Sequence, residues 1–375
     1  MNPFVIRGYV SPDLFCDRAE EAELLISNIN NNVDTTLISP RKFGKTGLIL
    51  HVFDRIAREN MPYKTVYLDI FSTLSLDGLV KALSGAIASE FPEKTSVGKK
   101  FLRYIKSFRP VITYDPLTGN PQFSFEYHNV AQKEATLKGL LEFLNTQEQP
   151  VVLAIDEFQQ ITEYPEKNTE ALLRSLLQQM HNLRLVFCGS KRKIMAQMFS
   201  TAGRPFFSST RTLSLSEIDN EVYKSFIVEK FYDAGVKVED DAIQYILDWT
   251  LRHTFYTQSL CNAVYATGNK TITVDLVNRV CTDILKQEEG NYLQIRELVT
   301  RKQWDLLSAL AGEGSVSQIS SAAFLDKYRL GAATTASHAL KSLMDKELVL
   351  DELSGCQPSY RVYDVFFMRW LAGNI

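Results

Sequence analysis

The sequence predicts an α/β domain with a parallel sheet and crossover helices, followed by an all-α subdomain and a small C-terminal domain. Up to about residue 215, short β-rich runs alternate with segments of helical length. Three of these runs are continuously apolar, which is typical of strands covered on both faces of a parallel sheet. Later in the chain, apolar residues recur mainly at helical spacing. The predicted strands of the first domain span residues 35–38, 65–70, 151–155, 183–188 and 211–215.

One segment of the first domain has the pattern of an inserted hairpin. Residues 110–127 alternate polar and apolar side chains on either side of the turn-forming cluster DPLTGNP. We therefore expect two antiparallel strands here, between the second and third strands of the main sheet.

The rest of the chain divides into a helical lid and a helix-turn-helix pattern. No strand pattern is present from residue 216 to about 290, and the expected lid helices span residues 222–234, 240–251 and 274–286. Three helices then precede two strands, an order typical of a winged helix. These elements are expected at residues 302–311, 319–328, 333–346, 348–352 and 359–362. The predicted domains are 1–215, 216–297 and 298–375.

The composition restricts the classes of function. With 41 basic and 44 acidic residues among 375, the net charge of −3 gives no reason to expect a nucleic acid or an anionic membrane as the main partner, so any such binding must be local. The N-terminus lacks a secretion-signal pattern, and no run of about 18 apolar residues is present. The five cysteines lack C-x-x-C spacing, which favours reduced thiols in a cytoplasmic protein.

The strongest motif is a phosphate loop between the first strand and the next helix. It reads Ser39, Pro40, Arg41, Lys42, Phe43, Gly44, Lys45 and Thr46, followed by Gly47. In this order of strand, loop and helix, backbone N–H groups and the helix dipole face the phosphates, and Gly44 lets the backbone approach closely. We expect Lys45 to bridge the β- and γ-phosphates of ATP and Thr46 to bind Mg²⁺. Ser39 replaces the first glycine of the consensus, which puts the loop geometry in question.

A matching acidic motif follows the apolar run at residues 151–155. Asp156, at the tip of this strand, is expected in the magnesium shell, and Glu157 is expected to orient and polarise the attacking water. The alternative, an ordinary strand capped by acidic residues, is less favoured because the phosphate loop supplies the matching chemistry. The two motifs together predict a P-loop NTPase that binds ATP and hydrolyses it.

A further strand leads to Ser190. In P-loop ATPases with a catalytic glutamate, a strand lies between the phosphate-loop strand and the acidic strand, and a polar residue at its tip contacts the γ-phosphate. Ser190 is the candidate for that role, with a small loop residue as the alternative. Arg204 and Arg211 are weaker candidates for a transition-state cation, because surface arginines in salt bridges are common.

These segments together resemble the archaeal-type ATPase family, in the STAND branch of AAA+-like P-loop proteins, and especially Bacteroidetes members with a C-terminal winged helix. The resemblance is carried by FCDRAEEAELL, SPRKFGKTGLI, VVLAIDEFQQI, LVFCGS, GRPFFSSTRTLSL, RHTFYTQSLCNAVY and YRVYDVFFMRWL. It implies a nucleotide-binding domain, a helical lid and a winged helix, with Asp17 and Arg18 near the adenine. It also implies that the start of residues 252–256 faces the nucleotide. The family's glycine-proline signature is replaced there, so Phe255 and Tyr256 are better read as core aromatics.

Two functions are compatible with these motifs. The first is a magnesium-dependent ATPase that acts as a nucleotide-operated switch, with an unidentified protein partner reading its ATP or ADP state. The second is a DNA-binding regulator whose winged helix is controlled by the nucleotide. Charge disfavours the second, because residues 301–375 carry eight basic and eight acidic side chains. The candidate recognition helix has only Lys341 and Lys346 as fixed cations.

Overall fold

The computed structural model describes residues 2–116, 119, 121–354 and 357–373. Within them the chain forms two compact units. The first unit comprises Arg7–Glu217, and the second joins residues 2–6 to the chain from Ile218 onwards. The first few residues therefore belong to the unit that contains the C-terminal half of the chain.

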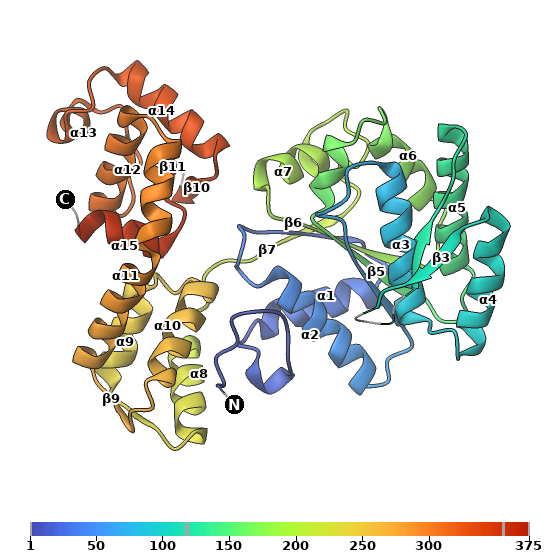
Figure 1. The fold of residues 1–375 in the computed structure, drawn as a ribbon, viewed down its shortest axis with the longest axis horizontal. Helices are drawn as coiled ribbons and strands as arrows, with labels where there is room; N and C mark the ends of the chain where they lie inside the picture. Colours follow the sequence, from blue (N-terminus) through green and yellow to red (C-terminus); the bar gives the residue numbers. More distant parts are fainter. Residues whose placement is uncertain (1, 117–118, 120, 355–356, 374–375) are drawn as a thin grey trace. The chain divides into compact units, whose positions relative to one another are not determined.

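The first unit is built on a five-stranded parallel sheet (Figure 1). The strand order is β2, β5, β6, β1, β7, so the strand leading to Ser190 separates the phosphate-loop strand from the acidic strand, as predicted. Every neighbouring pair is parallel. The strands are β1 (Thr35–Ile38), β2 (Lys64–Asp69), β5 (Val151–Asp156), β6 (Leu183–Gly189) and β7 (Arg211–Ser214). Each expected strand of this sheet is confirmed, with ends that differ by no more than about one residue.

The two faces of this sheet carry separate apolar cores. In β5, Val152 and Ala154 belong to the core that includes α1 and α2, whereas Leu153 and Ile155 belong to the core that includes α3 and α5. Alternate residues of a strand point to opposite faces, so a strand buried on both sides must be apolar throughout. The helices are η1 (Pro12–Leu14), α1 (Ala19–Asn30), α2 (Lys45–Arg58), α3 (Leu76–Glu90), α4 (Ser96–Ile105), η2 (Lys106–Phe108), α5 (Val130–Asn145), η3 (Phe158–Glu163), α6 (Thr169–Leu177) and α7 (Arg192–Ser200).

The segment between α3 and α5 carries the predicted hairpin. Strands β3 (Val111–Tyr114) and β4 (Pro121–Ser124) pair antiparallel. Residues 117, 118 and 120 of their turn lie outside the described residues. The preceding segment forms α4, a helix that the sequence analysis did not predict. Its buried residues Phe101 and Ile105 lie one helical turn apart, which joins α4 to the core of the unit.

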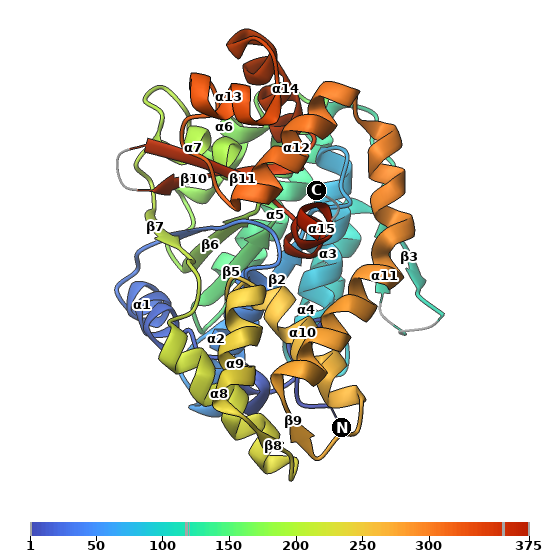
Figure 2. The same cartoon turned by 90° about the vertical axis from the view of Figure 1, so that its left-hand side faces the viewer.

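The second unit begins with four helices that pack together (Figure 2). They are α8 (Asn220–Asp233), α9 (Asp240–Trp249), α10 (Thr254–Ala266) and α11 (Val274–Leu298). The expectation that no strand occurs in this region is wrong, because β8 (Lys237–Val238) and β9 (Thr271–Ile272) form a short parallel pair. Two residues per strand are too few to produce the alternation on which a strand prediction depends.

The N-terminal segment is anchored among these helices. Phe4 is fully buried, with its ring centroid 4.8 Å from that of Phe231 in α8. Asn2 donates a hydrogen bond to the carbonyl of Asn262 at 3.0 Å, and Asn262 donates to the carbonyl of Phe4 at 2.7 Å. A buried ring and two reciprocal hydrogen bonds thus hold this segment in the second unit.

The C-terminal part has the helices and the two strands expected of a winged helix. It contains α12 (Arg301–Glu313), α13 (Ala322–Tyr328), α14 (Ala333–Asp345), β10 (Val349–Ser354), β11 (Gln357–Val362) and α15 (Val365–Gly373). Strands β10 and β11 pair antiparallel, and residues 355 and 356 lie outside the described residues. Helix α15 was not predicted. No helix in the described ranges is long and apolar enough to cross a membrane.

The lid helices and the winged helix share one apolar core. Tyr256 of α10 contacts Phe366 of α15, with ring centroids 4.8 Å apart, and Tyr292 of α11 contacts Phe367 at 5.1 Å. All four aromatic residues belong to the same buried cluster. The predicted division at residue 297 falls near the end of α11 and remains a prediction.

Candidate nucleotide-binding site

The phosphate loop spans residues 39–44, between the end of β1 and the first residue of α2. Gly44 precedes the helix with φ 93°, a left-handed conformation that favours glycine. Lys42 also has a positive φ, of 63°. Ser39, in contrast, does not have a positive φ. The missing consensus glycine therefore causes no backbone strain at this position, because a residue with a Cβ adopts the observed conformation without penalty.

Lys45 lies inside the loop rather than on its surface. Its side chain is 6% exposed, and its Nζ donates hydrogen bonds to the carbonyls of Ser39 at 2.9 Å and Pro40 at 2.8 Å. Burial lowers the pKa of Lys45, and the charges of Glu157 and Asp156 act in the opposite direction. The loop thus holds the lysine ammonium with two backbone oxygens.

Asp156 is held by hydrogen bonds from three directions. Its Oδ2 accepts from the Thr46 hydroxyl at 2.6 Å and from the Tyr67 hydroxyl at 2.7 Å, while its Oδ1 accepts from the backbone N–H of Glu157 at 2.9 Å. Asp156 and Thr46 are the two residues expected at the metal, and the structure brings them together. A carboxylate beside a hydroxyl is an oxygen donor set that fits Mg²⁺, whose remaining positions are usually filled by phosphate and water.

Glu157 has an uncommon backbone conformation and a well-defined side chain. Its φ of 54° and ψ of 40° are left-handed, which costs a non-glycine residue about 1 kcal/mol. Its Oε2 accepts hydrogen bonds from the Ser190 hydroxyl at 2.8 Å and from the Gln159 amide. Ser190 also accepts a long hydrogen bond of 3.5 Å from Nε of Arg41. Asp156, Glu157 and Ser190 therefore lie in one connected set, and Lys45 lies close enough for the charges of Glu157 and Asp156 to act on it.

Gly189 allows the close approach of the groups around Ser190. A Cβ at this position would lie 2.3 Å from Oε1 of Gln159 and 2.6 Å from Sδ of Met195. Both distances are shorter than real Cβ contacts, so a larger residue here would displace Gln159 or α7. The glycine in LVFCGS thus leaves room for the Gln159 amide that bonds Glu157, a reason that the sequence alone did not supply.

Asp17 and Arg18 lie in the segment before α1, and Arg18 contacts the phosphate loop. The Asp17 carboxylate accepts a hydrogen bond from the backbone N–H of Ala19 at 3.3 Å. Arg18 is 4% exposed and donates to the carbonyls of Phe43 at 3.5 Å and Ser216 at 2.7 Å. Arg18 therefore joins the phosphate loop to the end of the first unit. The expected place of these two residues near the adenine remains a prediction.

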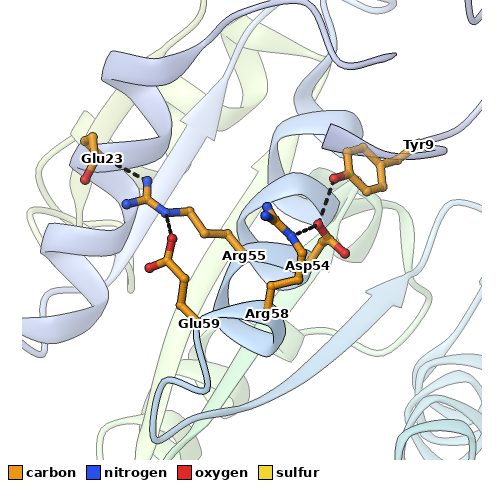
Figure 3. Close-up of polar contacts among 6 residues, drawn as sticks. All are labelled: Tyr9, Glu23, Asp54, Arg55, Arg58 and Glu59. Atoms are coloured by element: carbon orange, nitrogen blue, oxygen red, sulfur yellow. Dashed lines mark hydrogen bonds and ion pairs between the residues drawn. The ribbon is translucent and has the colours of Figure 1, made fainter. Parts of the chain in front are cut away.

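The segment before η1 is fixed to α2. The Tyr9 hydroxyl donates to Asp54 at 3.2 Å, and Asp54 also pairs with Arg58 (Figure 3). Phe15 stacks on His51 with centroids 4.5 Å apart, and a Cβ on Gly47 would lie 3.1 Å from the Phe15 ring. In the same helix, Arg55 forms ion pairs with Glu23 of α1 and with Glu59 (Figure 3). The helix that starts with Lys45 is thus held from two sides.

Three residues of the site were missed by the sequence analysis. Tyr67 and Gln159 bond the two catalytic carboxylates, and Cys188 is a fully buried thiol close enough to Asp156 for its charge to act on it. Burial raises the pKa of Cys188, and Asp156 acts in the same direction, so the thiol remains protonated. Gln159 lies two residues after Glu157, so the sequence could have identified it as a neighbour of the acidic motif. Tyr67 and Cys188 lie on other strands, and their roles depend on the register of the sheet.

The two arginines considered as transition-state cations and the aromatic residues of the segment 252–256 form structural contacts in the described part of the chain. Arg204 pairs with Glu170 on α6, and Arg211 donates a hydrogen bond of 3.1 Å to the side chain of Asn28. Both contacts agree with the interpretation of these arginines as surface residues with structural partners. His253 and Tyr256 are buried, with ring centroids 4.6 Å apart. The reading of Tyr256 as a core aromatic is therefore confirmed.

Comparisons with known proteins agree with this architecture. Residues 290–373 match the family described as a probable winged helix domain. The Walker-type ATPase PABY2304 of Pyrococcus abyssi is similar in structure, with a TM-score of 0.67 and 16% identity over 98% of this chain and 99% of that chain. No curated protein matches the sequence.

The ORC1 and ORC2 proteins of Aeropyrum pernix are also similar in structure. Its ORC2 protein, solved with ADPNP and ADP, has a TM-score of 0.59 and 14% identity over 100% of this chain and 96% of that chain. Its ORC1 protein, solved in complex with DNA, has a TM-score of 0.52 and 13% identity over 97% and 94% of the two chains. At these identities the likeness establishes the fold. The chain thus has a P-loop NTPase fold on a parallel sheet, followed by a helical region and a winged helix.

Proposed function

We propose that the chain binds ATP with Mg²⁺ and hydrolyses it. The observation that carries this proposal is the connected set around β5, in which Lys45, Thr46, Asp156, Glu157 and Ser190 converge at the carboxyl ends of the central strands. Open α/β sheets bind their ligands at this edge. The fold shared with Walker-type ATPases supports the proposal. The STAND assignment and the cytoplasmic location remain predictions.

Each residue has a role that its contacts support. Lys45 offers a charge to the β- and γ-phosphates, and the backbone N–H groups at the start of α2 add the positive end of the helix dipole. Thr46 and Asp156 would hold Mg²⁺, which neutralises phosphate charge when it is bound. Glu157 accepts a proton from the attacking water, and Ser190 keeps the Glu157 carboxylate oriented.

A magnesium titration tests the metal-binding role. ATP affinity of the wild type and of Asp156→Asn is measured by calorimetry with and without Mg²⁺. We expect Mg²⁺ to strengthen binding in the wild type and to have little effect in Asp156→Asn, because the amide loses the negative charge that attracts the cation. If Mg²⁺ strengthens binding equally in both proteins, Asp156 has no role at the metal.

We further propose that hydrolysis operates a conformational switch. Arg18 supports this idea because it bonds Phe43 of the phosphate loop and Ser216, two residues before the chain enters the second unit at Ile218. A change in the loop would therefore reach the connection between the units through one side chain. A protein partner would then distinguish the ATP state from the ADP state.

Hydrogen exchange tests the switch. The Glu157→Gln protein with ATP is compared with the ADP-bound wild type, and we expect different protection at residues 214–220 and in the second unit. Arg18→Lys keeps the charge but loses the second guanidinium contact, so it should reduce this difference without abolishing ATP binding. Identical exchange in both nucleotide states would exclude a switch while leaving the ATPase proposal intact.

A DNA-binding regulator is the second candidate. The match of residues 290–373 to a winged helix family favours it, and the ORC1 protein of similar fold was solved with DNA. The winged helix of this chain is neutral, however, with eight basic and eight acidic residues from 301 to 375. The ATPase switch is therefore the better supported function.

A further inference from the structure

The strongest concentration of charge on the first unit lies on the unpredicted helix α4. Six cationic residues are exposed in or beside this helix, and we call them the basic face: Lys94, Lys99, Lys100, Arg103, Lys106 and Arg109. Glu93 is the one carboxylate in the sequence from residue 93 to 114. This segment is strongly positive although the whole chain has a net charge of −3.

The packing of α4 fixes the direction of the basic face. Phe101 is fully buried, with its ring centroid 6.0 Å from that of Phe123 in β4 and 5.0 Å from that of Phe143 in α5. Gly98 also lies on this inner side, where a Cβ would lie 2.1 Å from the carbonyl oxygen of Pro92. Lys99, Arg103 and Lys106 follow a spacing of four and three residues on the opposite, solvent-facing side.

The cations of the basic face differ from several other cations of the first unit in having no carboxylate partner, although Arg103 donates a hydrogen bond of 3.3 Å to the carbonyl of Lys99. Among the described residues, no carboxylate forms an ion pair with any member of the basic face. Elsewhere in the same unit, Arg55, Arg58, Lys81 and Lys138 all form ion pairs with a carboxylate four residues away along the chain. A surface helix normally mixes both signs of charge, which limits self-repulsion and unspecific binding. An unmixed row of cations is costly to keep unless an anion meets it.

We propose that the basic face binds the phosphate backbone of a nucleic-acid duplex. Lys99, Arg103 and Lys106 extend over about 10 Å at 1.5 Å per residue. A duplex presents phosphates continuously over that length. A lysine-rich surface is better suited to bind phosphate than to bind another protein, because lysine is depleted in the centres of protein interfaces. A membrane is disfavoured, since an interfacial helix inserts its apolar side into lipid and the apolar side of α4 is packed against Phe123 and Phe143.

This contact carries no sequence readout. Phosphate contacts fix position but do not identify bases. Three or four neutralised phosphates give a slope of log affinity against log salt of about −3 to −4, and affinities of about 10⁻⁴ to 10⁻⁶ M are typical of such binding. The interaction would place the ATPase unit on a duplex without the help of the winged helix.

Fluorescence anisotropy of the full chain with a labelled duplex tests the proposal. The variant Lys99→Glu/Arg103→Glu/Lys106→Glu reverses three exposed charges, and we expect a loss of affinity of at least about tenfold and a salt slope smaller by about 3. The control Lys237→Glu/Lys270→Glu/Lys286→Glu makes the same change of net charge at exposed positions of the second unit. It should lose much less affinity. Unchanged ATP affinity of both variants confirms that the first unit is intact.

The probes distinguish the sources of phosphate. Binding of a DNA duplex, of an RNA duplex of the same sequence, or of both supports the proposal, and the tighter one identifies the natural class. Equal losses in the two triple variants would show that only bulk charge matters and would overturn it. Tighter binding to polyglutamate or to phosphatidylserine vesicles than to either duplex would overturn it in favour of an acidic protein or a membrane.

Discussion

The phosphate loop and helix α14 of the winged helix are both motifs that the sequence identifies, but their polar groups are arranged in opposite ways. At the loop, Lys45, Asp156 and Ser190 are 6%, 4% and 8% exposed, and hydrogen bonds converge on the carboxylates. On α14 most polar side chains are exposed, and Ser342 is the half-buried exception. The exposed ones are Thr334, Thr335, Ser337, His338, Lys341 and Asp345. Buried polar groups that converge on one point, as at the phosphate loop, indicate a ligand. A helix in the position of a recognition helix, such as α14, does not indicate a ligand when its polar groups fail to converge.

The largest effect is expected at the converging set. Lys45→Ala should weaken ATP binding by at least about 100-fold, because the change removes the charge that contacts the phosphates. Calorimetry measures this loss. Lys230→Ala is the matched control, since Lys230 lies in the second unit and is equally buried at 6% exposure. If both variants lose the same affinity, the effect comes from loss of folding, and the phosphate-loop assignment fails.

Most of this set was predictable because its signals are local in the chain. The segment SPRKFGKT follows an apolar strand directly, and Asp156 and Glu157 follow another, so a short stretch of sequence contains each motif together with its structural context. The position of Ser190 required only the strand order. Tyr67 was not predictable, because its hydroxyl reaches Asp156 from a neighbouring strand and depends on the register in which Asp69 pairs with Asp156.

The parts of the fold that were missed have different physical causes. The pair β8 and β9 consists of two residues each and shows no periodicity. The N-terminal residues join the second unit through one buried ring, Phe4, and two asparagine hydrogen bonds, which leave no pattern in the sequence. Helix α4 has an apolar repeat at Phe101 and Ile105 that fits a helix.

The next-largest effect is expected from a substitution that separates ATP binding from ATP hydrolysis within the converging set. Glu157→Gln should slow ATP turnover by about 10²-fold or more while ATP stays bound, because the amide orients water but cannot accept its proton. Phosphate release and nucleotide affinity are measured together. Glu163→Gln, at the exposed end of the 3-10 helix η3 that follows Glu157, should have neither effect. Wild-type turnover in Glu157→Gln would reduce this residue to a cap of the strand.

A smaller effect is expected at the support of this set. Tyr67→Phe removes one hydrogen bond of 2.7 Å to Asp156 and leaves the ring in place. Residues that orient a metal ligand typically change metal affinity by about 10-fold, so the Mg²⁺ concentration for half-maximal ATP binding should rise by about that factor. Affinity without Mg²⁺ should not change. Tyr63→Phe is the control, because the Tyr63 hydroxyl bonds Asn30 away from the site. Equal shifts in both variants would show that Tyr67 has only a structural role.

The smallest effect is expected on α14, where the winged-helix pattern and the charge balance lead to opposite expectations. Removing both lysines in Lys341→Ala/Lys346→Ala should leave the duplex affinity of the full chain unchanged within about twofold, because two exposed cations neutralise few phosphates. The salt slope should also stay close to that of the wild type, in contrast to the triple reversal on α4. Anisotropy with duplexes of different sequence should show no preference, since the neutral face of α14 offers no arginine for reading guanine. A tight, salt-resistant complex with one defined duplex, weakened by these two substitutions, would instead establish the winged helix as a DNA reader. It would move the regulator function ahead of the switch.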